Sequence, residues 1–109
     1  MGKLVRDKIP QIIRDSGKTP RVRVLETVDY EAALHDKLLE EADELREAAS
    51  PQECLGEAAD VLEVLLAIAG LHGFTLDDVI HAGVEKVAER GAFDGRVWLD
   101  GVEARQVGR

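Results

Sequence analysis

Several features that define common protein classes are scarce in this sequence. The chain has one cysteine, Cys54, in 109 residues, which excludes an intrachain disulfide and a cysteine-based metal site and favours a reducing compartment. The longest apolar run, residues 64–70, is far shorter than the roughly 18 residues of a membrane span. Residues 1–10 are charged and lack the apolar core of a signal peptide. We therefore expect a cytoplasmic protein that does not enter a membrane.

Basic charge is also in the minority. The chain has 14 Lys and Arg against 22 Asp and Glu, a formal net charge of −8. This balance argues against a nucleic-acid polymer as partner, because phosphate groups demand a basic face. The acid is concentrated, since residues 26–63 carry thirteen acidic and two basic side chains. Such a run is either a solvated acidic surface or a cation-binding site, and helical geometry distinguishes the two.

The segmentation of the chain predicts an all-α protein. Its length fits one domain over residues 1–109, since domains typically span about 100–150 residues. Asp7 is placed to cap a short first helix, and Ser50 to cap a later one with Pro51 at its first position. Apolar spacing and these caps predict one short and three long helices. They cover residues 8–16, 29–49, 51–73 and 75–91.

Two short segments outside these helices alternate polar and apolar residues, as half-exposed strands do. Residues 21–24 read Arg-Val-Arg-Val, and residues 95–99 read Gly-Arg-Val-Trp-Leu. Pairing the two segments predicts a small two-stranded ribbon that ties the termini together.

The first long helix points its acids in different directions. At about 100° per residue, an apolar stripe is centred on Leu38. Glu41 lies about 60° from that centre, and Glu44 and Lys37 follow on the same side at about 100–120°. Glu40 points almost directly away. Glu41 and Glu44 therefore flank the core, and Glu40 faces solvent or a partner.

The second long helix is apolar on two sides, as a central helix is. One face contains Leu55 and Leu62, and the other contains Val64. Glu57 and Asp60 project onto the face of Val64, where the pattern asks for hydrophobic residues. One chain does not cover both apolar faces, so we expect a homodimer or a higher homo-oligomer.

The two acidic pairs, Glu41 with Glu44 and Glu57 with Asp60, are each spaced i, i+3 and so share a helical face. If the helices pack antiparallel, as their short connection suggests, the pairs face each other. Two carboxylates about 4 Å apart repel by on the order of 4 kcal/mol at an effective dielectric near 20. A cation must neutralise them, and Lys37 alone is not enough. The all-oxygen set suits Mg²⁺, with Mn²⁺ as a substitute.

The same residues carry a family signature. The segment KLLEEADE, residues 37–44, is followed after twelve residues by EAAD, residues 57–60. Together they resemble the EExxE and ExxD motifs of the MazG-like all-α NTP pyrophosphohydrolases. The segments LVRDKIP, residues 4–10, and EKVAERG, residues 85–91, resemble a small branch of this superfamily, predicted house-cleaning pyrophosphatases for noncanonical nucleotides.

The resemblance implies roles for five acidic residues. Carried over by position, the Mg²⁺ ligands are Glu41, Glu44, Glu57 and Asp60, the four that the helical projection also selects. Glu41 thereby becomes a catalytic residue. Glu40 matches the acid that positions or activates the attacking water in the family, although its projection points outward in this chain.

The resemblance also implies cationic partners for the substrate phosphates. Lys86 and Arg90 match the pair on the last helix that approaches the triphosphate, and the alternative is that they pair with neighbouring acids. Arg6 and Lys8 from the basic N-terminal segment, and Lys37 beside the acids, are further candidates for phosphate contacts. For Arg6 and Lys8 the alternative is plain surface charge.

The reaction that the resemblance implies is hydrolysis of a ribo- or deoxyribonucleoside triphosphate between the α and β phosphates, giving the monophosphate and pyrophosphate. Two alternatives stay open: phosphoribosyl-ATP as the substrate, and a non-catalytic helical module that binds nucleotides or a protein partner. Trp98 and Tyr30 are the candidates to stack on a base, although each also suits a place in a core.

Overall fold

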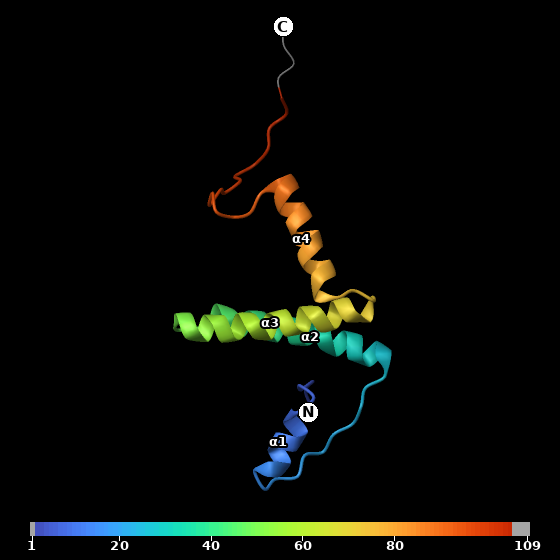
Figure 1. Ribbon diagram of the computed structural model, residues 1–109. Helices are drawn as coiled ribbons and strands as arrows, with labels where there is room; N and C mark the ends of the chain where they lie inside the picture. Colours follow the sequence, from blue (N-terminus) through green and yellow to red (C-terminus); the bar gives the residue numbers. More distant parts are fainter. Residues whose placement is uncertain (1, 106–109) are drawn as a thin grey trace. The chain divides into compact units, whose positions relative to one another are not determined.

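The computed structural model describes residues 2–105, and within that range the regular secondary structure consists of four α-helices (Figure 1). The predicted all-α class is confirmed. The chain divides into two compact units between Leu76 and Asp77, and each unit is described by itself. The helices are α1 (Ile9–Asp15), α2 (Thr27–Arg46), α3 (Pro51–Leu71) and α4 (Leu76–Arg90).

Local chemistry explains where α3 begins and ends. Oγ of Ser50 accepts a hydrogen bond from the Glu53 N–H at 3.1 Å, and Pro51 occupies the first turn. The Glu53 carboxylate accepts in turn from the N–H of Ala49, the residue before the cap, at 2.8 Å, a variant of the capping box in which the reciprocal bond lies one residue earlier. At the other end Gly73 has φ +82°, a left-handed conformation that glycine adopts without steric cost.

The start of α1 differs from the prediction. Asp7 does not cap this helix, because the N-cap position belongs to Lys8, whose side chain makes no capping hydrogen bond. The chain enters the helix through a turn in which the Ile9 N–H donates to the Arg6 carbonyl at 3.0 Å. Pro10 follows in the first turn, where its missing N–H costs nothing.

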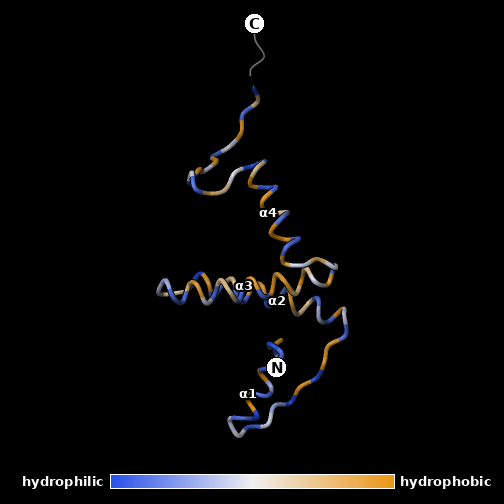
Figure 2. The backbone as a smooth tube through the Cα atoms, in the orientation of Figure 1, coloured by the Kyte–Doolittle hydropathy of each residue, from blue (hydrophilic) through white to orange (hydrophobic). Residues whose placement is uncertain are grey.

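The predicted two-stranded ribbon is not observed, since no strand forms within residues 2–105. Residues 21–24 and 95–99 are irregular, and Val24 and Val97 are 97% and 90% exposed. The connection between α1 and α2 carries apolar residues, orange in Figure 2, outside any helix. An isolated pair of strands is marginal in water without a larger apolar face to pack on, so alternating polarity was not sufficient.

In the first unit, α2 and α3 run antiparallel and side by side (Figure 1). Among the described residues, the buried hydrophobic side chains are Leu34 on α2 and Val64 on α3. The opposite face of α3 is open to solvent, with Leu55 67% and Leu62 44% exposed. The remaining buried side chain in this part of the chain is the carboxylate of Glu41, an unusual occupant because ionisable groups are almost never fully buried without a partner.

The second unit contains α4 from Asp77 onward, and its described residues, 77–105, are all exposed. The helix stops at Gly91, which has φ +84° and donates its N–H to the Val87 carbonyl at 2.8 Å. Exposed Val84 and Val87 give α4 apolar surface of its own. Across the described part of the chain, no helix has the length and apolar character needed to cross a membrane.

Candidate functional site

Three carboxylates from α2 and α3 converge near one end of the helix pair. Oxygen atoms of Glu41, Glu44 and Glu57 lie within 4.8 Å of one another. Glu41 and Glu44 stand three residues apart on α2, and Glu57 reaches them from α3 because the two helices run antiparallel. We call these three residues the acidic cluster.

Burial makes the acidic cluster costly unless a cation is present. Glu41 is only 7% exposed. With the carboxylates ionised, Oε2 of Glu41 and Oε2 of Glu57 are buried and have no hydrogen-bond partner. A buried carboxylate oxygen without a donor is strongly unfavourable. The donors are all oxygen, which is the ligand type that Mg²⁺ and Mn²⁺ prefer, so the residues present fit a hard divalent cation.

The surroundings of Glu41 favour its protonated form. Burial, the largest effect, raises the pKa of its carboxyl, and the adjacent Glu44 raises it further through hydrogen bonding and like charge. The Lys37 ammonium lowers the pKa, and Asp60 raises it again by repulsion. A cation binding to this carboxylate would therefore have to displace its proton.

This raised pKa gives a prediction about stability. The unfolded chain releases the Glu41 proton near the usual pKa of 4.5, and the folded chain releases it at higher pH. Within that interval the folded state holds more protons, so the free energy of unfolding decreases as pH rises. Thermal unfolding in EDTA should show Glu41→Gln gaining stability over wild type as pH increases from 4.5. A difference between the two proteins that does not vary with pH would contradict this.

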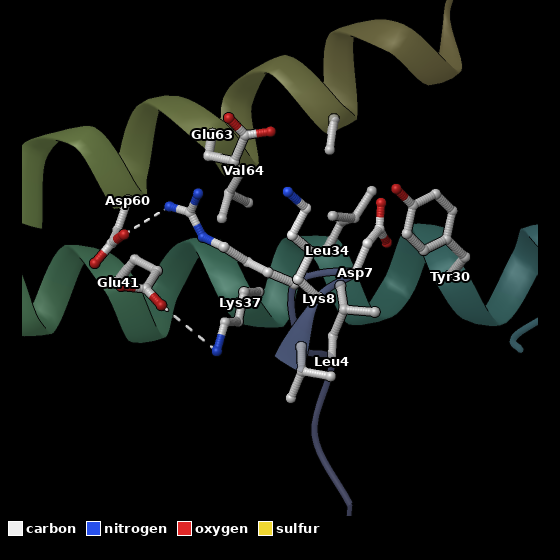
Figure 3. Close-up of a pocket in the computed structure, with 13 residues that line it drawn as sticks. Leu4, Asp7, Lys8, Tyr30, Leu34, Lys37, Glu41, Asp60, Glu63 and Val64 are labelled. Carbon is white, nitrogen blue, oxygen red and sulfur yellow. Dashed lines mark hydrogen bonds and ion pairs between the residues drawn. The ribbon is translucent and has the colours of Figure 1, made fainter. Parts of the chain in front are cut away.

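Two cations border the acidic cluster. Nζ of Lys37 lies 3.5 Å from Oε1 of Glu41 (Figure 3) and 3.4 Å from Oε1 of Glu40. Nη2 of Arg6 lies 2.6 Å from Oδ1 of Asp60. Lys37 is shared between Glu40 and Glu41, and Arg6 pairs with Asp60, so the two cations are outnumbered by the carboxylates around them.

Asp60 and Glu40 occupy different positions from the acidic cluster. Asp60, the fourth expected ligand, is close enough to Glu41 to raise its pKa, but the three-carboxylate group does not include it. The side chain of Glu40 is 45% exposed and pairs with Lys37, in agreement with its outward projection.

A cavity of about 430 Å³ adjoins the acidic cluster. It lies between the segment 4–8 and the facing sides of α2 and α3 (Figure 3). Along α2 its lining passes from Tyr30 through Leu34 to Glu41, an axial span of about 16 Å at 1.5 Å per residue. One end of the cavity therefore holds the acids, the other holds Tyr30 and Leu34 with the Asp7 carboxylate beside them (Figure 3), and the volume is that of a small-molecule site.

The remaining predicted cations lie in different places. Lys8 joins Arg6 and Lys37 in the lining of the cavity. Lys86 and Arg90 are exposed on α4 in the second unit, and neither takes part in the ion pairs found among residues 2–105.

Sequence reasoning missed the partner of Asp60. Arg6 and Asp60 are 54 residues apart in the chain, and no helical or strand periodicity connects them. The cluster of basic residues in residues 1–25 was the signal available, and it indicated phosphate contacts but not a contact with an acid on α3.

Comparison with known proteins places the chain in a family. A family model described as phosphoribosyl-ATP pyrophosphohydrolase matches residues 9–87. An uncharacterized protein of Mycolicibacterium smegmatis is 56% identical over 48 residues, which are 44% of this chain and 49% of that protein. The chain thus spans about half the length of this curated relative. No solved structure matches. Because the family match covers most of its length, the chain belongs to the phosphoribosyl-ATP pyrophosphohydrolase family, within the MazG-like all-α NTP pyrophosphohydrolase superfamily.

Proposed function

We propose that this protein is a Mg²⁺-dependent pyrophosphohydrolase that cleaves nucleoside triphosphates between the α and β phosphates. The products are a nucleoside monophosphate and pyrophosphate, and the substrates are noncanonical nucleotides removed by house-cleaning. The observation that carries the proposal is the buried Glu41 carboxylate, which belongs to the acidic cluster and also lines the cavity. The single cysteine supports a cytoplasmic setting.

The metal ligands in this proposal are Glu41, Glu44, Glu57 and Asp60. Bound Mg²⁺ supplies charge neutralisation and a water of lowered pKa for attack on phosphorus. The helix pair holds the carboxylates on two rigid elements, so the site is assembled before substrate arrives.

The chain's own side chains supply the rest of the chemistry. Lys37 is fixed between Glu40 and Glu41, and its ammonium is therefore held where a phosphate oxygen next to the metal needs a cation. Glu40 is half-exposed and can accept a hydrogen bond from a water at the rim, which orients that water for attack.

The lining of the cavity favours one orientation of the bound nucleotide. Its acidic end and its lining cations Arg6, Lys8 and Lys37 suit the phosphates, and the Tyr30 and Leu34 end suits the nucleoside. Lys86 and Arg90 remain proposed phosphate ligands from α4, because two exposed cations one turn apart on a helix can bind the same polyphosphate.

The proposal includes self-association into a homodimer or a larger homo-oligomer. It is supported by the exposed apolar face of α3, since contiguous apolar surface of this kind marks interaction sites.

A second candidate substrate is phosphoribosyl-ATP. The observation that favours it is the match of residues 9–87 to the family described by that name. The bond cleaved and the metal chemistry are the same in both candidates, and the difference lies in which nucleoside or ribosyl group the Tyr30 end of the cavity accepts.

A substrate panel tests the proposal. Purified protein with Mg²⁺ should convert at least one canonical, damaged or phosphoribosyl-linked triphosphate into monophosphate and pyrophosphate, resolved by ion-exchange chromatography. In water labelled with heavy oxygen, the label should enter the monophosphate or the pyrophosphate and identify the phosphorus attacked. EDTA should abolish turnover. Release of orthophosphate and a diphosphate would overturn the assigned bond, and nucleotide binding without turnover would favour a non-catalytic module.

A further inference from the structure

Asp60 differs from the other three acids because an arginine holds it. The Arg6 guanidinium lies 2.6 Å from its carboxylate, the contact drawn at Asp60 in Figure 3. This is the distance of a charge-assisted hydrogen bond. The oxygens of Glu41, Glu44 and Glu57 gather within 4.8 Å, and Asp60 stands outside that group. The fourth carboxylate is therefore neutralised by the protein itself.

The ion pair between Arg6 and Asp60 is weak enough for a divalent cation to replace Arg6 as the partner of Asp60. Its side chains are 56% and 41% exposed, and ion pairs in contact with water contribute only about 0–1 kcal/mol. A divalent cation carries twice the charge of a guanidinium and gains the buried Glu41 and Glu57 oxygens as additional ligands. A divalent cation therefore binds Asp60 more strongly than Arg6 does.

The position of Arg6 allows its side chain to move while its backbone stays in place. Its carbonyl accepts from the Ile9 N–H at 3.0 Å, in the turn that begins α1. Arg6 also lines the cavity beside Lys8 and Lys37. Asp60 lines the same cavity, so rotation of the Arg6 side chain need only turn the guanidinium away from Asp60 and toward the space where the proposed triphosphate binds.

We propose that Arg6 is the resident counter-cation of Asp60 in the metal-free protein, that a divalent cation displaces it, and that the released guanidinium then binds the substrate phosphates. This inference rests on the proposed function, because it takes Asp60 as a metal ligand. It makes metal binding the step that prepares the cavity for nucleotide, since one event completes the ligand set and frees a phosphate-binding cation.

Calorimetric titration with Mn²⁺, without nucleotide, tests the exchange. Arg6→Ala removes the competitor for Asp60 and should bind Mn²⁺ about two- to five-fold more tightly than wild type, the factor that corresponds to a pair worth up to about 1 kcal/mol. Arg14→Ala is the matched control, because Arg14 is an exposed arginine on α1 outside the cavity lining. It should bind Mn²⁺ as wild type does.

Two further measurements separate exchange from a structural role. In an Asp60→Asn background, Arg6→Ala should no longer tighten Mn²⁺ binding. At saturating Mn²⁺, Arg6→Ala should bind a non-hydrolysable nucleoside triphosphate about ten-fold more weakly than wild type, since a charge-assisted hydrogen bond to phosphate is lost. A purely structural Arg6 would instead weaken both ligands together.

Three other results would contradict either the exchange or the metal site itself. If wild type binds Mn²⁺ but Arg6→Ala binds it no more tightly, Arg6 does not compete for Asp60, and the exchange is wrong while the proposed function stands. Equal tightening in the Asp60→Asn background would show that the effect does not pass through Asp60. If wild type binds no Mn²⁺, the metal site fails, and the proposed function fails with it.

Discussion

Glu41→Gln is expected to lower turnover by about 100-fold or more and to leave a folded protein that is more stable than wild type without metal at neutral pH. The two effects have one cause. Glu41 is only 7% exposed, and its ionised carboxylate is destabilised by burial and by repulsion from Glu44 and Asp60. A neutral amide of the same shape removes that cost and also removes the negative charge that would bind a cation.

The expected loss of activity is about 100-fold or more, since even groups that only hydrogen-bond to metal ligands are worth about 10- to 100-fold. Steady-state pyrophosphate release measures it, and Mn²⁺ titration should show the affinity falling in parallel. Thermal unfolding in EDTA at neutral pH should give a higher midpoint for the variant. The combination of lost activity and gained stability is typical of a functional site that carries strain.

Asp43→Asn is the matched control for Glu41→Gln. It removes the same charge from the same helix, at an exposed position two residues away. It should leave activity, Mn²⁺ affinity and stability close to wild type, because exposed charges contribute little. If Glu41→Gln keeps full activity, or if Asp43→Asn loses as much, the buried carboxylate is not the centre of the site.

The parts of the fold that follow from the sequence are those fixed by neighbouring residues. The caps of α3 are an example, because Ser50, Pro51 and Glu53 interact within a single turn. The inward direction of Glu41 follows from the angle between successive helical residues, and it was predictable for the same reason. The ribbon was not predictable, because residues 21–24 and 95–99 depend on an apolar support that no local pattern specifies.

The candidate site divides in the same way. The acidic cluster follows from two i, i+3 pairs on helices joined by a short connection. The different position of Asp60 among the four acids does not follow from the sequence. It depends on the contact between Arg6 and Asp60, which are 54 residues apart. Long-range pairs of this kind have no sequence period, so only the structure separates the three clustered carboxylates from the one paired with arginine.

Folding of this protein is expected to depend on its concentration. The described residues bury only Leu34 and Val64 as hydrophobic side chains, whereas hydrophobic burial is the main term that offsets conformational entropy. Leu55 and Leu62, on the exposed face of α3, are available to a second copy. If association supplies the missing burial, the midpoint of thermal unfolding should rise with protein concentration.

The double variant Leu55→Gln/Leu62→Gln should dissociate the protein and lower its unfolding midpoint. A leucine buried at an interface is worth about 1.5–3 kcal/mol, and a twofold interface contains each substitution twice. Even half the lower value at each position weakens association by about 100-fold. In an isolated chain the same changes would be nearly neutral, because both side chains are already exposed.

Light scattering and sedimentation measure this effect directly. Leu39→Gln is the control, since Leu39 is 68% exposed on α2 and off the apolar face of α3. It should leave the association constant within a few-fold of wild type. A wild-type protein that stays monomeric, with an unfolding midpoint independent of concentration, would mean that the α3 face is not an interface. The few buried side chains of one chain would then have to stabilise the fold alone, although a domain of this size ordinarily buries about two-thirds of its surface.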